Sequence, residues 1–337
     1  MSRPKIGLTA PLPHPTIEIL DKYCETETYT KDELLEKGLL KLVTGKDGLI
    51  CTVADKITSE VMDIEPNLKV ISSYSVGFDH VDLTEATKRG IYVTNTPGVL
   101  TETTADLTWA LLMSTARRIT ESDRYIREGR WNVAWAPDMM VGEDIHGRTL
   151  GIVGLGRIGS AIAKRASGFN MKVLYHDVIR LSQEVEKELS LEYTSLENIL
   201  EESDYITLHV ALNEHTHHLI NEEKLKKMKS TAYLINASRG PVIDQKALAK
   251  ALKEGWIAGA AIDVYEKEPI AVDDPLLQLD NIVLVPHIGS ASRAARSKMG
   301  EVAAKNLVSI LKGEQPVSLV NNDVLNVRPL SEMKIIS

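Results

Sequence analysis

Short runs rich in valine and isoleucine alternate with helix-like stretches along most of this chain. The first series of such runs is Lys5–Ala10, Gly48–Val53, Lys69–Ser75 and Gly90–Thr96. A second series follows at Thr149–Leu155, Met171–Asp177, Tyr205–Ala211, Thr231–Ser238, Ala260–Tyr265 and Asn281–His287. Buried parallel strands joined by helical crossovers have this pattern. The sequence therefore predicts an α/β fold with two doubly wound parallel sheets of the Rossmann-like type.

The chain length and the segments between the two series indicate two domains. At roughly 100–200 residues per domain, 337 residues correspond to about two. A long helical stretch, Thr101–Gly129, separates the series, and a last helix, about Ser292–Lys312, follows the second sheet and is expected to return to the first domain. We expect a discontinuous substrate-binding domain of residues 1–100 plus 290–325, and an NAD-binding domain of residues 101–289.

Composition and charge exclude several classes of protein. The net charge of −8 and the pI near 5.7 argue against a nucleic-acid or anionic-membrane binder, whose phosphate contacts need a basic surface. Cys24 and Cys51 have neither metal-site spacing nor the density of a disulfide scaffold. The first residues lack the apolar core of a signal peptide, and no apolar run is long enough to span a bilayer. We expect a soluble cytoplasmic protein with a small-molecule partner.

The sharpest local motif is GLGRIG, Gly154–Gly159, between a predicted strand and a predicted helix. In a dinucleotide-binding motif, Gly154 permits the tight turn, Gly156 lets the backbone approach the pyrophosphate, and Gly159 allows the helix to pack closely on the strand. The N-terminus of the helix then offers free N–H groups to the phosphates. The alternative, a glycine-rich turn that binds nothing, is disfavoured by the strand that follows.

That next strand ends at Asp177, 18 residues after Gly159. A carboxylate near this distance meets the adenosine ribose hydroxyls and repels a 2′-phosphate, which favours NAD over NADP. Arg180 weakens this inference, because an arginine beside this position can hold a phosphate. The strictness of the NAD preference therefore stays open.

Three later strands lead into reactive residues: Arg239 and Glu268 follow their strands, and His287 ends the last one. Ligands of α/β sheets sit outside the carboxyl ends of the strands. Reduction of a 2-keto acid needs an anchor for its carboxylate, which arginine supplies, and a proton donor near neutral pH, which histidine supplies beside an orienting carboxylate. Each residue alone has a structural alternative, as a turn arginine, a loop acid or a strand-end histidine. Their joint order behind a dinucleotide motif favours a catalytic set.

At this point the sequence resembles the D-isomer-specific 2-hydroxyacid dehydrogenase family along nearly its whole length, and within it the glyoxylate/hydroxypyruvate reductases. The matching motifs are GLGRIG, NASRGPVID (Asn236–Asp244), AAIDVYEKEP (Ala260–Pro269) and PHIGSAS (Pro286–Ser292). The resemblance implies Arg239 as substrate anchor, His287 as acid/base and Glu268 as its partner. It implies further that Asp263 meets the nicotinamide carboxamide.

The resemblance also carries the remaining site residues that we predict. The cofactor contacts are Thr104, Gly154, Leu155, Gly156, Arg157, Ile158, Gly159, Asp177, Val210, Ala237, Ser238, Asp263 and Gly289. The substrate contacts are Val53, backbone groups at Val76 and Gly77, Trp135 and Ser290. A homodimer is implied through the Thr101–Gly129 region, with a tryptophan near Trp131 or Trp135 reaching the partner's active site; ordinary packing is the alternative for both tryptophans.

The predicted substrate loop, Ser72–Asp82, carries no arginine or lysine. Relatives that act on phosphoglycerate or lactate usually have a basic residue there, so a compact uncharged tail is favoured, and no regulatory domain is expected after Asn321. A D-lactate or D-3-phosphoglycerate dehydrogenase is the alternative enzyme. A redox-sensing interaction protein, like the co-repressors that resemble this family, is the alternative of another class.

Two histidine-containing clusters resemble metal sites, and we expect a metal at neither. His215, His217 and His218 lack acids at ligand spacing and precede Asn221, which is predicted to cap a helix. In the Asp79–Asp82 segment, Asp82 is predicted as the N-cap of the helix before Gly90.

Overall fold

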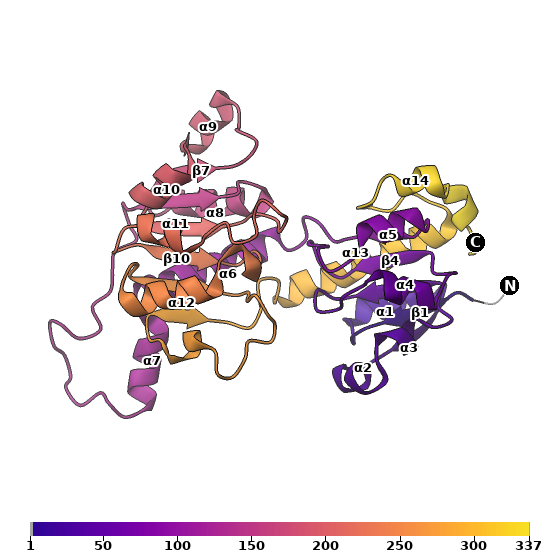
Figure 1. The fold of residues 1–337 in the computed structure, drawn as a ribbon, viewed down its shortest axis with the longest axis horizontal. Coiled ribbons are helices and arrows are strands. Elements are labelled where there is room, and N and C mark those ends of the chain that lie inside the picture. Colours follow the sequence, from indigo (N-terminus) through magenta and orange to yellow (C-terminus); the bar gives the residue numbers. More distant parts are fainter. Residues whose placement is uncertain (1–2, 337) are drawn as a thin grey trace. The chain divides into compact units, whose positions relative to one another are not determined.

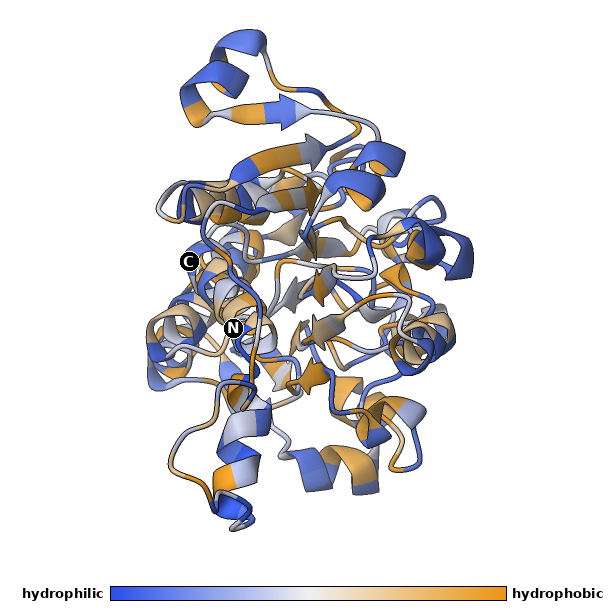
Figure 2. Cartoon of the chain, turned by 90° about the vertical axis from the view of Figure 1, so that its left-hand side faces the viewer, coloured by the Kyte–Doolittle hydropathy of each residue, from blue (hydrophilic) through white to orange (hydrophobic). Residues whose placement is uncertain are grey.

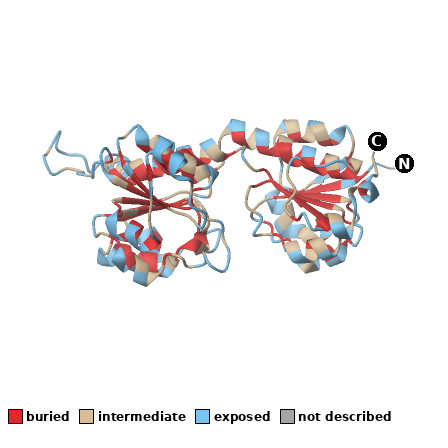
Figure 3. Cartoon of the chain, turned by 90° about the horizontal axis from the view of Figure 1, so that it is seen from above, coloured by how far each residue is buried: buried red, intermediate tan, exposed pale blue. Residues whose placement is uncertain are grey.

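The computed structural model describes residues 3–336, which form two compact units (Figure 1). Unit 1 contains the residues up to Leu100 together with the segment from Ala291 onward, and unit 2 is Thr101–Ser290. Each unit is a parallel sheet with helices on both faces (Figure 3). The predicted fold class is confirmed.

Unit 1 has a five-stranded sheet in the order β2-β1-β3-β4-β5, every pair parallel. This is the flavodoxin-like strand order. Its strands are β1 (Lys5–Leu8), β2 (Glu25–Thr28), β3 (Gly48–Cys51), β4 (Val70–Ser73) and β5 (Tyr92–Thr94). Its helices are α1 (His14–Asp21), α2 (Lys31–Lys37), α3 (Leu39–Val43), α4 (Ser59–Ile64), α5 (Leu83–Lys88), α13 (Arg293–Lys312) and α14 (Val324–Val327), with a 3₁₀ turn at Leu330–Met333.

The helix α13 attaches the C-terminal segment to unit 1. The Ser292 side chain caps it by accepting from the Ala295 N–H at 3.1 Å, and Gly313, at φ +74°, ends it. The Ser72 hydroxyl in β4 donates to the Ala303 carbonyl oxygen at 2.9 Å. The predicted final helix therefore packs on the first sheet.

Unit 2 has a seven-stranded parallel sheet in the order β12-β11-β10-β9-β6-β7-β8. The order reverses on the two sides of β6, and such switch points hold dinucleotides in α/β sheets. The strands are β6 (Thr149–Val153), β7 (Lys172–His176), β8 (Leu191–Tyr193), β9 (Tyr205–Leu208), β10 (Tyr233–Asn236), β11 (Gly259–Ile262) and β12 (Ile282–Leu284). The helices are α6 (Thr101–Ala116), α7 (Ile119–Arg127), α8 (Arg157–Ser167), α9 (Gln183–Leu189), α10 (Leu196–Glu202), α11 (Glu222–Lys227) and α12 (Gln245–Glu254), with 3₁₀ turns at Gly240–Val242 and Pro275–Gln278.

Successive residues of the unit 2 strands pack into two different hydrophobic cores, one on each face of the sheet. Leu234 packs with the helices α10 to α12, whereas Ile235 packs with α6 and α8 on the opposite face. Both side chains are fully buried. Because both sheet faces are covered, the strands are continuously apolar instead of alternating, and hydrophobic positions concentrate on them in Figure 2.

Three details differ from the sequence prediction. Most strands end two or three residues earlier, since the residues after them turn into loops; the strand predicted at Asn281–His287 ends at Leu284. The edge strands β2 and β8 were not predicted, because their short sequences lack an apolar run. The single helix predicted over Thr101–Gly129 is wrong: Arg118, at φ +52°, separates α6 from α7.

Both predicted helix caps are confirmed. The Asp82 carboxylate accepts from the Glu85 N–H at 3.0 Å at the start of α5. The Asn221 side chain accepts from the Lys224 N–H at 3.1 Å at the start of α11. Within residues 3–336, no helix combines the length and hydropathy that a membrane span requires.

Candidate active site

The three glycines of the β6–α8 loop meet three different surroundings. Gly154 has φ +92°, and a Cβ atom there would lie 2.8 Å from the backbone carbonyl of His209. A Cβ atom on Gly159 would lie 2.2 Å from the Gly154 carbonyl oxygen. A Cβ atom on Gly156 would meet nothing within 4 Å, and Gly156 and Arg157 are exposed at the N-terminus of α8. Two glycines thus serve packing, while the third leaves open the approach to a helix N-terminus, which fits a pyrophosphate.

Asp177 follows β7 and connects the glycine loop to the next turn. One carboxylate oxygen accepts from the Leu155 N–H at 2.6 Å, and the other accepts from the Ile179 N–H at 3.1 Å. Each carboxylate oxygen can accept more than one hydrogen bond. The carboxylate is therefore held beside the glycine loop with capacity left for ribose hydroxyls.

Arg180, the predicted alternative phosphate ligand, is paired inside unit 2. Its Nε and Nη2 contact the two oxygens of Glu186 at 2.8 and 2.9 Å. The hydrogen bonds from Arg180 and from the Tyr175 hydroxyl lower the pKa of Glu186 to about 2. This pair was not predicted.

The other predicted cofactor residues cluster after the carboxyl ends of strands. Val210 follows β9, Ala237 and Ser238 follow β10, and Asp263 and Gly289 follow β11 and β12. Thr104 is buried in α6, and a Cβ atom on Gly289 would contact both Asp263 and Thr104, at 3.1 and 3.4 Å. Leu155 and Ile158 belong to the glycine loop and the start of α8. All are therefore in unit 2, at the sheet edge where α/β folds bind ligands.

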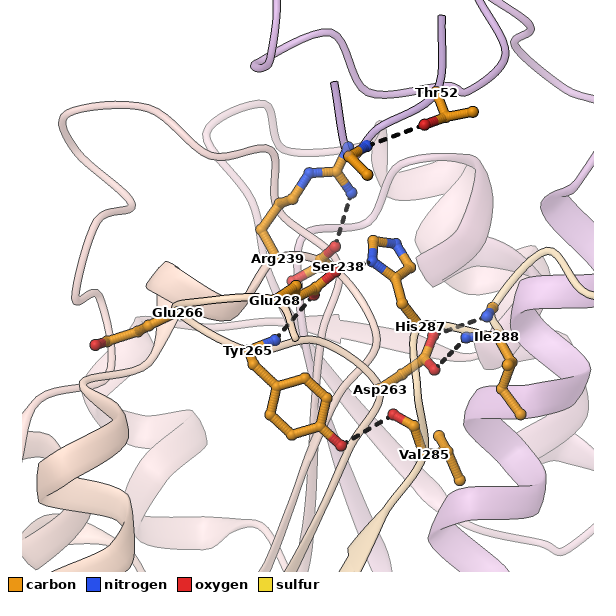
Figure 4. Close-up of polar contacts among 12 residues, drawn as sticks. Thr52, Ser238, Arg239, Asp263, Tyr265, Glu266, Glu268, Val285, His287 and Ile288 are labelled. Carbon is orange, nitrogen blue, oxygen red and sulfur yellow. Dashed lines mark hydrogen bonds and ion pairs between the residues drawn. The ribbon is translucent and has the colours of Figure 1, made fainter. Parts of the chain in front are cut away.

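His287 and Glu268 form an ion pair in which His287 Nδ1 lies 2.6 Å from Glu268 Oε2 (Figure 4). The other oxygen of Glu268 accepts from the Tyr265 N–H at 3.1 Å. Burial opposes ionisation of Glu268, but His287, the Tyr265 N–H and the charge of Arg239 together outweigh it and hold the pKa of the carboxyl below its usual value. A carboxylate at Nδ1 orients the ring and leaves Nε2 as the nitrogen for proton transfer.

The backbone around His287 is fixed by Asp263. The His287 N–H donates to the Asp263 carbonyl oxygen at 2.8 Å, and the Asp263 carboxylate accepts from the N–H groups of Ile288 and Gly289 at 2.5 and 2.7 Å. His287 adopts φ +53°, which is uncommon for a residue other than glycine. Burial, partly offset by these hydrogen bonds, raises the pKa of Asp263 to about 6.

Arg239 occupies a turn that packs on the loop of Glu268. A Cβ atom on Gly240 would lie 1.9 Å from the Tyr265 carbonyl, so only glycine permits this contact. The Arg239 carbonyl oxygen accepts from Asn236 Nδ2 at 2.9 Å. The Nη1 of Arg239 donates to the Ser238 carbonyl oxygen at 2.9 Å. In Figure 4 the side chains of Arg239, Glu268 and His287 lie beside one another. Unit 2 therefore combines a guanidinium, a carboxylate and an imidazole in one place.

The predicted substrate residues of unit 1 lie on two loops after strands. Asn95 Nδ2 donates to the Val76 carbonyl at 2.7 Å, and the Ser75 hydroxyl donates to the Gly77 carbonyl at 2.5 Å. Among residues 3–336, neither the Val76 nor the Gly77 N–H has a hydrogen-bond acceptor. These two N–H groups are therefore available to an anion. Val53 follows β3 and is half-buried.

The remaining predicted contacts differ in their surroundings. Ser290 ends unit 2 and is half-buried. Trp135 is 75% exposed, in the segment after α7. The predicted residues are positioned by three that were not predicted: Tyr265, Gly240 and Asn236. The only sequence signal for them was their place inside the matching motifs.

Comparison with known proteins identifies the family. The D-isomer specific 2-hydroxyacid dehydrogenase NAD binding domain matches residues 109–289. The glyoxylate reductase of Korarchaeum cryptofilum is 54% identical over 97% of this chain and 98% of its own. The chain belongs to the D-isomer-specific 2-hydroxyacid dehydrogenase family. It is an NAD(P)-dependent enzyme, as the sequence predicted.

Solved structures agree with this membership. The Thermus thermophilus protein TT0316 is 46% identical, with a TM-score of 0.88 over 94% of this chain and 99% of its own. The NADPH-dependent glyoxylate/hydroxypyruvate reductase of Sinorhizobium meliloti, in complex with NADP and malonate, is 32% identical, with a TM-score of 0.83 over 96% and 98% of the two chains. The glycine loop, with its open position at Gly156, fits the nicotinamide dinucleotide that this family uses.

Proposed function

We propose that this dehydrogenase reduces small 2-keto acids, glyoxylate and hydroxypyruvate first, with NADH as the preferred donor. The observation that carries the proposal is the His287–Glu268 pair beside Arg239, at the carboxyl ends of the strands that follow the glycine loop. The Ser72–Asp82 loop, which carries no arginine or lysine, and the names of the similar reductases support a compact substrate.

Each residue of the set has a distinct part in the reaction. Arg239 anchors the substrate carboxylate and polarises the keto oxygen with its planar fork. His287 delivers the proton from Nε2 to the oxygen as negative charge develops, and Glu268 stabilises the charged imidazole and fixes its orientation. The Val76 and Gly77 N–H groups in unit 1 offer donors for a carboxylate, which supports unit 1 as the substrate-binding domain. The bound cofactor supplies the hydride that the chain itself cannot provide.

A panel of substrates tests the proposal directly. Catalytic efficiency is measured for glyoxylate, hydroxypyruvate, pyruvate and phosphohydroxypyruvate with NADH and with NADPH. We expect the first two acids to be reduced fastest with NADH. A higher efficiency with phosphohydroxypyruvate or pyruvate would replace the proposal with one of the two alternative dehydrogenases.

The NADH preference is tested at Asp177. Its carboxylate would accept from the ribose hydroxyls and repel a 2′-phosphate, so Asp177→Ala should reduce the ratio of NADH to NADPH efficiency by about tenfold or more, since tenfold corresponds to about 1.4 kcal/mol. The measurement is the pair of catalytic efficiencies in parent and variant. An unchanged ratio would remove Asp177 from the ribose site.

A cytoplasmic homodimer completes the proposal. Both cysteines are buried free thiols, as suits a reducing compartment. Large hydrophobic side chains of α7 and the segment after it are 52–75% exposed: Ile119, Ile126, Trp131, Val133 and Trp135. Exposed apolar side chains gathered in one segment support an interface with a second copy.

A further inference from the structure

The turn between β7 and α9 carries a cationic group and a buried anion that the proposed reaction does not use. Arg180 lies in this turn, three residues after Asp177, and its side chain is half-exposed. Glu186 lies on α9, and its side chain is only 10% exposed. A buried carboxylate needs a compensating charge. Arg180 provides that charge through the two contacts of 2.8 and 2.9 Å.

Two tyrosines complete the arrangement around this ion pair. The Tyr175 hydroxyl donates to Glu186 at 2.8 Å and accepts from the Leu181 N–H at 2.9 Å. The Arg180 guanidinium also lies over the ring of Tyr193, 5.1 Å from its centroid. We call Tyr175, Arg180, Glu186 and Tyr193 the arginine clamp. One edge of the guanidinium binds the carboxylate, and one face covers the aromatic ring.

The arginine of the clamp lies in the turn that directly follows Asp177, the predicted ribose ligand. An arginine just after the strand that ends at the ribose-binding carboxylate is suited to bind a 2′-phosphate. Here its charge is balanced by Glu186, and its Nε/Nη2 edge is already used. Binding a phosphate in this bidentate fashion would require the ion pair to break and would leave Glu186 buried without its cation. That cost disfavours the phosphorylated cofactor.

We propose that Glu186 is a specificity-determining positioning residue, which holds Arg180 away from the 2′-phosphate position and so reinforces the rejection of NADP. The inference rests on the proposed place of Asp177 at the ribose. Discrimination between NAD and NADP then has two independent parts. Asp177 repels the 2′-phosphate, and Glu186 binds the Arg180 guanidinium that could otherwise contact this phosphate.

Nucleotide binding tests the inference without relying on turnover. Dissociation constants for NAD⁺ and NADP⁺ are measured by isothermal titration calorimetry in the Asp177→Ser enzyme, which removes the repulsion. Adding Glu186→Gln should strengthen NADP⁺ binding by about tenfold, the worth of one charge-assisted contact, and change NAD⁺ binding less than twofold. Glutamine can still accept from Tyr175, so the turn keeps one of its anchors. Adding Arg180→Ala to that double variant should cancel the NADP⁺ gain.

A matched variant keeps the test decisive if Glu186→Gln does not fold. In the Asp177→Ser enzyme with Glu186 intact, Arg180→Ala should leave the NADP⁺ dissociation constant within twofold, because the clamped arginine does not reach the phosphate. A loss of NADP⁺ affinity there would overturn the inference. So would a Glu186→Gln effect that is absent or equal for both nucleotides. If Asp177→Ser alone leaves the NADP⁺ to NAD⁺ ratio at the parent value, the ribose assignment fails, and the inference fails with it.

Discussion

At the residue scale, the contact between His287 and Glu268 sets the expected pH dependence of catalysis. Reduction requires a proton donor at Nε2 of His287, and the Glu268 carboxylate 2.6 Å from Nδ1 orients the ring for that transfer. The pKa of Glu268 lies below its usual value, so the carboxylate stays ionised well into the acidic range. Glu268→Gln should therefore lower the catalytic efficiency for glyoxylate and remove the acidic limb that protonation of Glu268 produces in the parent profile.

His287→Asn is the matched comparison for this prediction. Asparagine cannot deliver the proton, so activity should fall by about 100-fold or more at every pH, as expected for loss of a general acid. The measurement is catalytic efficiency for glyoxylate against pH in the parent and both variants. If Glu268→Gln leaves both the catalytic efficiency and the acidic limb as in the parent, the acid/base pair is wrongly assigned.

His209 gives a second pH prediction, on stability instead of catalysis. Burial lowers the pKa of His209 to about 4, and its Nε2 has no hydrogen-bond partner among the described residues. Between about pH 6.5 and pH 4, histidine in the unfolded chain, with a pKa of about 6.5, is protonated, whereas His209 in the folded protein stays neutral. Protonation therefore favours the unfolded chain, and stability is lost as the pH falls through this range. At about 1.4 kcal/mol per unit, the loss is at most about 3 kcal/mol.

His209→Gln should remove this part of the pH dependence. Between pH 7 and pH 4.5, the free energy of unfolding in urea should fall less in the variant than in the parent, by up to about 3 kcal/mol. Comparing the loss of unfolding free energy between the two pH values in the parent with the loss in the variant cancels any effect of the substitution that does not depend on pH. Equal losses in parent and variant would show that His209 is protonated in the folded state.

At the element scale, the β6–α8 loop separates cofactor binding from packing. Alanine at Gly156 meets nothing within 4 Å, so Gly156→Ala should unfold at a temperature close to that of the parent but bind NADH at least about tenfold more weakly, because its methyl group occupies the pyrophosphate approach. Gly159→Ala places a methyl group 2.2 Å from the Gly154 carbonyl oxygen and should cost about 1–3 kcal/mol of stability. Calorimetric unfolding and NADH titration of both variants check this. If Gly156→Ala and Gly159→Ala lowered stability equally, the two glycines would not have separate roles in cofactor binding and packing.

The helices and strands differ in how well the sequence predicted them. The apolar runs revealed the central strands, because both sheet faces bury them, and the glycine spacing located the loop. The edge strand β2, with the sequence ETET, has no apolar run, since its side chains are exposed or only partly buried. The break at Arg118 depends on one backbone conformation that no sequence period encodes. The Arg180–Glu186 pair stayed hidden because a charged side chain six positions away has many alternative partners.

The candidate site was predictable for a different reason. Arg239, Glu268 and His287 come after successive strands, and parallel topology brings the carboxyl ends of those strands to one edge. The supporting contacts were not predictable, since they depend on backbone approach. Gly240 against Tyr265 is one case, and the Asp263 carboxylate on the two N–H groups after His287 is another.

At the scale of the whole molecule, the proposed dimer depends on α7 and the segment that follows it, which extend away from the body of unit 2 (Figure 1). Ile126 on α7 is 56% exposed. A charge there would be buried without a partner in a dimer but solvated in a monomer. Ile126→Glu should therefore raise the dimer dissociation constant by at least about tenfold, equivalent to about 1.4 kcal/mol.

Sedimentation velocity across a concentration series measures this dissociation, and Val272→Glu is the control. Val272 is 94% exposed in a different segment of unit 2, so a charge there should leave the association unchanged. Trp135→Ala should keep the dimer but change the ratio of efficiencies for glyoxylate and hydroxypyruvate, because the side chain would reach the partner's substrate. A parent enzyme that sediments as a monomer while fully active would refute both the interface and the role of Trp135. Weakened association in the Val272 variant would instead point to a general effect of added negative charge on a protein that already carries a net charge of −8.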